Sequence, residues 1–182
     1  MKLKKKHETF DGTKIVVVAD THSDPHPRTH ELVAREKPDL VLHAGDIGDL
    51  RVVKDLEAIA PTWAVRGNID VRLPNLPDLL TIDVMRGGER LFGIMLFHIA
   101  VAGPRLRGDA AKLARAEGAN IVVCGHSHVP FIGVDRGLTI FNPGSIGPRR
   151  FHLPIVFGVM DIVEGRVSMK HVSCETGEDW MP

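Results

Sequence analysis

Tyrosine is absent from this 182-residue sequence, cysteine occurs only twice, and aromatic residues make up 5% of the chain. The two cysteines, Cys124 and Cys174, lie far apart, which excludes a disulfide framework and a cysteine-based zinc motif and favours a reducing compartment. Lys plus Arg equals Asp plus Glu at 23 each, so the chain lacks the positive excess of a dedicated nucleic-acid binder. No apolar run approaches the roughly 20 residues that span a bilayer. We therefore expect a cytoplasmic protein with no dedicated nucleic-acid binding and no membrane contact.

The composition that remains is typical of a soluble globular domain, with 43% hydrophobic and 25% charged residues. The length fits the soft prior of roughly 150 residues per domain and suffices to bury a core without disulfides or metals. The N-terminus is basic, and no apolar segment of the signal-peptide type follows it. We expect a single domain over residues 1–182, with residues 1–9 forming a flexible basic tail.

Short β-branched runs alternate with helical stretches in the first part of the chain. The predicted order is strand 15–19, helix 28–36, strand 40–43, helix 50–60 and strand 62–65. This alternation is typical of parallel βαβ units. The later predicted elements are strands 79–85 and 90–97, helix 110–117, and strands 121–124, 130–134, 138–141, 154–163 and 166–172. The sequence thus predicts an α/β fold with parallel units first and antiparallel hairpins later.

Side chains that can bind metal ions follow five of the predicted strands. These seven predicted ligands are Asp20, His22, Asp46, Asn68, His98, His126 and His128. The carboxyl ends of strands in open α/β sheets line one crevice, so we expect all seven at the same rim. Glycines at 45, 67 and 125 are expected to let the backbone turn sharply there. Each motif alone is more often structural, but their joint occurrence at strand ends predicts a metal site.

The number of predicted ligands suits two ions better than one. One ion could take Asp20, His22, Asp46 and His128, and the other Asp46, Asn68, His98 and His126, with Asp46 as the bridge. Sites with two ions about 3.5–4 Å apart are arranged for displacement at phosphorus, and coordination makes a water molecule easier to deprotonate. Carboxylate, amide and imidazole donors without thiolate suit manganese, zinc, iron, nickel or cobalt rather than calcium or magnesium. We expect two divalent ions per chain, with manganese preferred.

The order of the motifs resembles that of the calcineurin-like metallophosphoesterases. The motifs are Asp20-x-His22, Gly45-Asp46, Gly67-Asn68-x-Asp70, His98 and Gly125-His126-Ser127-His128. Asn142-Pro143-Gly144-Ser145, followed by Arg149, looks like the small bacterial and archaeal phosphodiesterase branch of that superfamily. The resemblance covers about residues 14–150. It implies two mixed β-sheets packed as a sandwich flanked by helices, a dinuclear site, hydrolysis of phosphodiesters by a metal-bridging hydroxide, and a homo-oligomer.

Further roles follow from the same motifs. Asp46 and Asn68 are the candidate catalytic residues, together with the metal-bound hydroxide. Asp70 either hydrogen-bonds a ligand or the loop backbone, or is a turn residue. Arg149 and Ser145 are candidates for substrate binding. Arg149 and Arg150 could bind a phosphate bidentately, and the competing interpretation is an exposed basic pair.

The sequence departs from the family pattern at two places. Many relatives have histidine where this chain has Ile69, which cannot donate a proton. A general acid typically contributes 10²–10⁴-fold, so we expect weak turnover of alkyl monoesters. Ile99 and Ala100 follow His98 where relatives usually have glycine and a polar residue, so substrate specificity cannot be transferred from them.

Three functions are compatible with these motifs. The first is a metal-dependent phosphodiesterase acting on a small phosphate ester. The second is a non-catalytic metal-binding interaction module, as in the retromer subunit of the same fold; eroded ligands would indicate it, and here all seven are present. The third is a nuclease, for which a net charge of zero offers no electrostatic funnel. The histidines outside the motifs are expected to be structural or exposed, with His43 the most buried.

Overall fold

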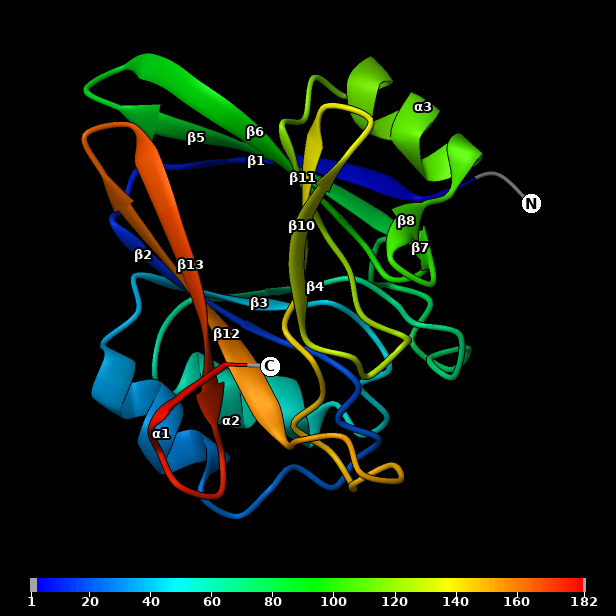
Figure 1. Cartoon of the computed structure of the whole chain (residues 1–182), viewed down its shortest axis with the longest axis vertical. Coiled ribbons are helices and arrows are strands. Elements are labelled where there is room, and N and C mark those ends of the chain that lie inside the picture. Colours follow the sequence, from blue (N-terminus) through cyan, green and yellow to red (C-terminus); the bar gives the residue numbers. More distant parts are fainter. Residues whose placement is uncertain (1–2, 182) are drawn as a thin grey trace.

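Two six-stranded mixed sheets form the body of the protein in the computed structural model, which describes residues 3–181 (Figure 1). In strand order, the first sheet consists of β1 (Lys5–Phe10), β5 (Leu79–Arg86), β6 (Glu89–Phe97), β9 (Ile121–Val123), β11 (Leu138–Asn142) and β10 (Phe131–Asp135). The second consists of β14 (Asp179–Trp180), β13 (Arg166–Ser173), β12 (Val156–Val163), β2 (Lys14–Val18), β3 (Leu40–His43) and β4 (Thr62–Ala64). Strands β7 (Val101–Ala102) and β8 (Arg105–Leu106) form a separate hairpin. The predicted pair of mixed sheets is confirmed.

Apolar side chains on both faces of the sheets explain the layered packing. Ile15 and Val17 of β2 lie in the core between the sheets, whereas the alternate residues Val16 and Val18 pack on the other face. That other face of the second sheet is covered by α1 (Thr29–Glu36) and α2 (Arg51–Glu57). Helix α3 (Gly108–Ala116) covers the outer face of the first sheet. Because β2 is buried on both faces, its sequence is a continuous apolar run, and the predicted sandwich flanked by helices is confirmed.

The N-terminal segment differs from the prediction. Residues 5–10 form β1, which pairs in parallel with β5 at the edge of the first sheet, so a flexible tail over residues 1–9 is wrong for residues 5–9. Its polar side chains bind acidic partners: His7 Nε2 lies 2.7 Å from Asp83 Oδ2, and Lys5 pairs with Glu117. A charged edge strand lacks the apolar alternation that marks a strand in a sequence. Residues 1 and 2 of the predicted tail lie outside the described residues.

Two smaller differences concern element lengths. Helix α2 is shorter than the predicted helix 50–60, and the two-residue strands β7, β8 and β14 were not predicted. Within residues 3–181, no helix combines the length and the apolar character needed to cross a membrane.

Candidate metal centre

The seven predicted ligands converge from both sheets. The loops after β2, β3 and β4 of the second sheet carry four of them, and the segments after β6 and β9 of the first sheet carry the other three. Six of these side chains form two groups in which all ligand atoms lie within 4.8 Å of one another. The groups are Asp20, His22 and His128, and Asp46, His98 and His126. The predicted sets contain the same three residues each, with Asp46 added to the first set and Asn68 to the second.

Asp46 is the carboxylate that contacts both groups. Its Oδ1 atom lies 3.2 Å from His98 Nε2 in its own group, and its Oδ2 atom lies 3.9 Å from His22 Nε2 in the other. Asn68, the seventh predicted ligand, has its Oδ1 atom 3.2 Å from His98 Nε2 and so adjoins the second group. The bridging position predicted for Asp46 agrees with these distances.

Most predicted ligands have a backbone conformation that non-glycine residues rarely adopt. Positive φ angles occur at five of the seven, namely Asp20 (54°), His22 (49°), Asp46 (55°), His126 (68°) and His128 (59°). Such conformations cost roughly 1–3 kcal/mol each and persist where the surrounding structure enforces them, which is characteristic of functional sites. Here the two loops of the second sheet hold each other, because Asp20 N donates to Gly45 O (2.9 Å) and His22 N to Asp46 O (3.0 Å).

The three glycines beside the ligands have two different roles. Gly45 has a φ of 95° and provides a sharp turn, as predicted. Gly67 and Gly125 do not have positive φ, so a turn is the wrong explanation for them; they are needed for space. A Cβ atom at Gly67 would lie 2.0 Å from Asp46 Oδ1, and one at Gly125 would lie 2.9 Å from Asp20 Oδ2. These two glycines let the two ligand carboxylates approach the backbone.

Asp70 supports the loops that carry the ligands. Its buried carboxylate accepts hydrogen bonds from Gly48 N (2.9 Å), Gly67 N (2.8 Å) and Ile47 N (3.1 Å). It thereby joins the loop of Asp46 to the loop of Asn68. Of the alternatives that the sequence left open, these contacts favour a bond to the loop backbone.

His43 is a second supporting residue, whose role the sequence did not reveal. It is fully buried, as expected, and burial lowers its pKa to about 4, so the ring is neutral near pH 7. Its Nδ1 atom accepts a hydrogen bond from Gly45 N (3.2 Å), which leaves Nε2–H to donate to Thr21 Oγ1 (2.6 Å). In the same region, His98 Nδ1 donates to Ala44 O (2.7 Å), which directs Nε2 toward Asp46. Such contacts fix the orientation and tautomer of metal-binding imidazoles.

The two carboxylates have opposite pKa shifts. Burial raises the pKa of Asp20 to about 7, although His126 N donates to its carboxylate (2.9 Å). Burial also acts to raise the pKa of Asp46, but the hydrogen bond and the charge of His98 outweigh it and lower the pKa to about 2. For His98 itself, burial acts to lower the pKa, and its contact with Asp46 reverses the direction. The site therefore holds a buried negative charge at Asp46 and a carboxyl at Asp20 that is partly protonated near pH 7 when no cation is bound.

The donor atoms fit divalent cations. His22 Nε2 lies 3.3 Å from His128 Nε2, which in turn lies 3.4 Å from Asp20 Oδ1. Burial lowers the pKa of both His22 and His128, so both rings are neutral near pH 7 and each has one ring nitrogen without a proton, which is the form that binds a metal ion. A cation bound between these atoms would accept the lone pairs of the ring nitrogens and of the carboxylate oxygen. The set is nitrogen and oxygen only, as in manganese, zinc, iron, cobalt and nickel sites.

The structure does not place the two predicted substrate-binding residues at the site. Arg149 Nη1 donates to Leu153 O (2.8 Å), and its Nη2 atom pairs with Glu175. The buried Ser145 hydroxyl donates to Asp20 O (2.9 Å), so it supports a ligand instead. The neighbouring Arg150 is the arginine at the site, with Nη2 3.3 Å from His22 Nε2. No feature of the sequence distinguishes the two adjacent arginines.

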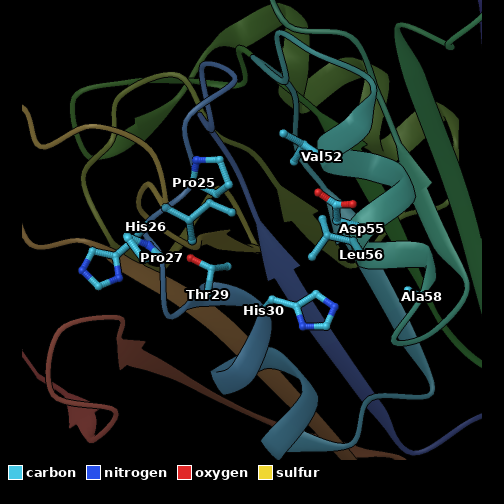
Figure 2. A pocket seen from close by; sticks show the side chains of 10 residues that line it. Pro25, His26, Pro27, Thr29, His30, Val52, Asp55, Leu56 and Ala58 are labelled. Atoms are coloured by element: carbon cyan, nitrogen blue, oxygen red, sulfur yellow. The ribbon is translucent and has the colours of Figure 1, made fainter.

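Of two surface pockets described here, one lies away from the predicted ligands and the other adjoins them. A pocket of about 270 Å³ between residues 25–30 and α2 contains none of the predicted ligands; Figure 2 shows His26 and Thr29 on one side and Asp55 and Leu56 on the other. A smaller pocket of about 180 Å³ does adjoin the site, since Asn68 and His98 line it.

Comparison with known proteins agrees with this geometry. Residues 13–165 match the calcineurin-like phosphoesterase superfamily domain. A "probable metallophosphoesterase" of Methanocaldococcus jannaschii is 33% identical over 153 residues, which cover 76% of this chain and 73% of that protein.

Two solved structures share the fold. One is described as a novel archaeal phosphodiesterase, with a TM-score of 0.66, 20% identity, and coverage of 87% of this chain and 99% of that one. The other is Vps29 from Entamoeba histolytica in complex with zinc, with a TM-score of 0.66, 22% identity, and coverage of 88% and 99%. Fold, motif order and family match coincide, and the chain belongs to the calcineurin-like phosphoesterase superfamily.

Proposed function

We propose that this protein is a phosphodiesterase that uses two divalent cations. Its family membership supports a phosphoesterase hydrolase. The observation that carries the dinuclear proposal is the position of Asp46, whose two carboxylate oxygens each face a histidine of a different ligand group. One anionic group between two cations offsets their mutual repulsion, which is the arrangement that a two-metal site requires.

Each cation has a defined set of residues that would hold it. Asp20, His22 and His128 would bind one, and Asp46, His98 and His126 the other. Asn68 would join the second set. Bound cations would supply Lewis acidity toward phosphoryl oxygens and lower the pKa of coordinated water.

Arg150 is the side chain placed to bind the phosphate of a substrate. Its guanidinium lies beside His22 and is exposed to solvent, so an anion can reach it. A guanidinium can bind two phosphate oxygens at once and keeps its charge at every relevant pH. Arg150 would therefore orient the phosphoryl group over the first ligand group.

Ile69 favours diesters over alkyl monoesters. It follows Asn68, its side chain is 41% exposed, and its backbone N–H donates to Asp46 Oδ1 (3.2 Å), so residue 69 lies at the rim of the site. An isoleucine gives no proton to a departing alkoxide, a step that a general acid accelerates about 10²–10⁴-fold. The structural neighbour described as an archaeal phosphodiesterase is compatible with diester chemistry, although a similarity at 20% identity concerns the fold alone.

The alternative is a non-catalytic module, which the similarity to Vps29 keeps open. That similarity, at 22% identity, concerns the fold alone. The complete set of seven ligands, with strained backbone at five of them, favours catalysis, because an interaction surface does not need that strain.

Hydrolysis of a chromogenic phosphodiester, measured beside the matching monoester with one added metal at a time, tests the proposal. We expect turnover to require a metal, to be highest with manganese, and to favour the diester. Asp46→Asn removes the shared negative charge and should abolish activity. Asp39→Asn is a matched control. Asp39 also accepts backbone hydrogen bonds, but it lies at the amino ends of β2 and β3, opposite the ends that carry the predicted ligands.

Turnover that stays at background with every metal would refute the enzymatic proposal and favour the module. Equal turnover of monoester and diester would refute the diester preference only. Full activity of Asp46→Asn would refute the bridging role.

A further inference from the structure

The pocket of about 180 Å³ beside the second ligand group has a specific chemical character. Its walls include Asn68 and His98, which belong to the site, and the apolar side chains of Leu3, Phe97 and Ile99. A phosphoryl group bound at the ligands would therefore have this pocket directly next to it. Ile99 is one of the two positions at which the sequence departs from the family pattern.

A positively charged side chain, Arg66, forms another part of the pocket wall. Its guanidinium is bound to Asp78, with Nε donating to Oδ1 at 3.1 Å. Asp78 is itself held by Lys4 N, which donates to Oδ2 at 2.8 Å. The Arg66 side chain is 16% exposed and so has little freedom to move. Guanidinium groups stack on aromatic rings, and the apolar neighbours favour a ligand without charge.

We propose that this pocket is a subsite for a planar aromatic group of the phosphate ester, such as an aryl group or a nucleobase. The inference rests on the proposed function, because the phosphoryl group anchors the ligand at the neighbouring cations. The hollow is open to solvent on one side, and its volume is of the order of one ring, since an enclosed engineered cavity of about 150 Å³ lined by Leu, Ile and Phe binds benzene. It is smaller than the roughly 300–1,000 Å³ of a site for a complete drug-sized ligand. The phosphoryl group and the rest of the ester remain outside the pocket.

Phosphonates with a single substituent provide the test. Isothermal titration calorimetry on the metal-loaded protein compares phenylphosphonate with methylphosphonate, which share the phosphoryl anchor and differ only in the ring. We expect phenylphosphonate to bind roughly tenfold tighter or better, because apolar pockets discriminate by at least this factor per small group. Leu3→Ser should reduce this preference several-fold and leave the affinity for methylphosphonate unchanged, and Ile99→Ser, which lies next to the predicted ligand His98, should also reduce the preference.

Val71→Ser is the matched control, since Val71 is an exposed apolar residue of the loop after β4 and does not line the pocket. Leu3 is not among the predicted ligands, so its variant tests the subsite without a change next to a ligand. Equal affinity for the two phosphonates, or an undiminished preference in both pocket variants, would overturn the subsite and leave the proposed function intact. If neither phosphonate bound and the diester were not hydrolysed, both inferences would be wrong.

Discussion

Replacement of Asp70 by alanine is the sharpest test of how the site is held together. The change leaves three backbone N–H groups, of Ile47, Gly48 and Gly67, without their common acceptor. Each donor that is buried without a partner costs about 1–3 kcal/mol. Gly48 and Gly67 are half-buried, so water reaches their N–H groups and only Ile47 bears the full cost; we expect a loss of about 2–4 kcal/mol in the free energy of unfolding.

The assay is urea unfolding of the metal-free protein, which separates the loss of hydrogen bonds from the loss of a bound ion. Metal titration of the folded variant measures the second effect. Because Asp70 joins the loops of Asp46 and Asn68, cation affinity should fall about 10–100-fold, the range typical for groups that orient metal ligands. Asp70→Asn, which keeps one acceptor oxygen, should show the same effects to a smaller degree and serves if the alanine variant does not fold.

Asp39→Ala is the matched control for this experiment. Its carboxylate accepts hydrogen bonds from the backbone N–H groups of Thr13 and Lys14, so the variant also loses a backbone brace. No predicted ligand lies on the loops that it joins, and metal affinity should stay at the wild-type value. An Asp70→Ala protein with unchanged stability and unchanged metal affinity would refute the bracing role.

Three further outcomes are expected. Ile69→His should raise alkyl monoester turnover roughly 10-fold or more by supplying a general acid, and unchanged turnover would show that residue 69 does not face the leaving group. Because burial raises the pKa of Asp20 from 3.8 to about 7, the native metal-free protein binds more protons than the unfolded chain between those values, and this group's contribution to stability falls as pH rises through them. Asp20→Asn has no carboxyl to titrate and should not lose stability in this way. In urea unfolding, the free energy of unfolding of the variant relative to that of the wild type should therefore increase by up to about 4 kcal/mol between pH 4 and pH 8. A difference that does not change with pH would contradict the raised pKa of Asp20. Gly67→Ala should displace Asp46, since its Cβ would lie 2.0 Å from Oδ1, and should weaken metal binding in a titration, whereas Gly108→Ala, whose Cβ would lie at an ordinary contact distance of 3.9 Å from Arg136 Nη1, should not.

The residues of the two ligand groups could be predicted to lie together because they are polar residues in positions where the pattern of a buried strand stops. Asp20 and Asp46 each follow a run of β-branched or aliphatic residues closely, and that contrast is visible without a structure. The same reasoning found the inner strands, whose two buried faces give continuous apolar runs. The edge strand β1 escaped it, because its lysines and His7 are held by acidic side chains from distant parts of the chain.

The supporting residues could not be predicted in the same way. An aspartate such as Asp70 gives one sequence signal whether it ends a turn, binds a ligand or accepts backbone hydrogen bonds, and only the positions of the donors decide among these roles. The choice between Arg149 and Arg150 depends on the direction of each side chain, which a pair of identical residues does not encode. The space needed at Gly67 depends on the carboxylate of Asp46, a residue far away in the sequence.

Asp46 follows a strand of one sheet and His98 directly follows a strand of the other, yet their side chains lie 3.2 Å apart. An ion bound at this contact would cross-link the two layers, so its departure would loosen the seam between them. Loss of the proposed ions would then make the protein more susceptible to proteolysis, in addition to the loss of the proposed activity.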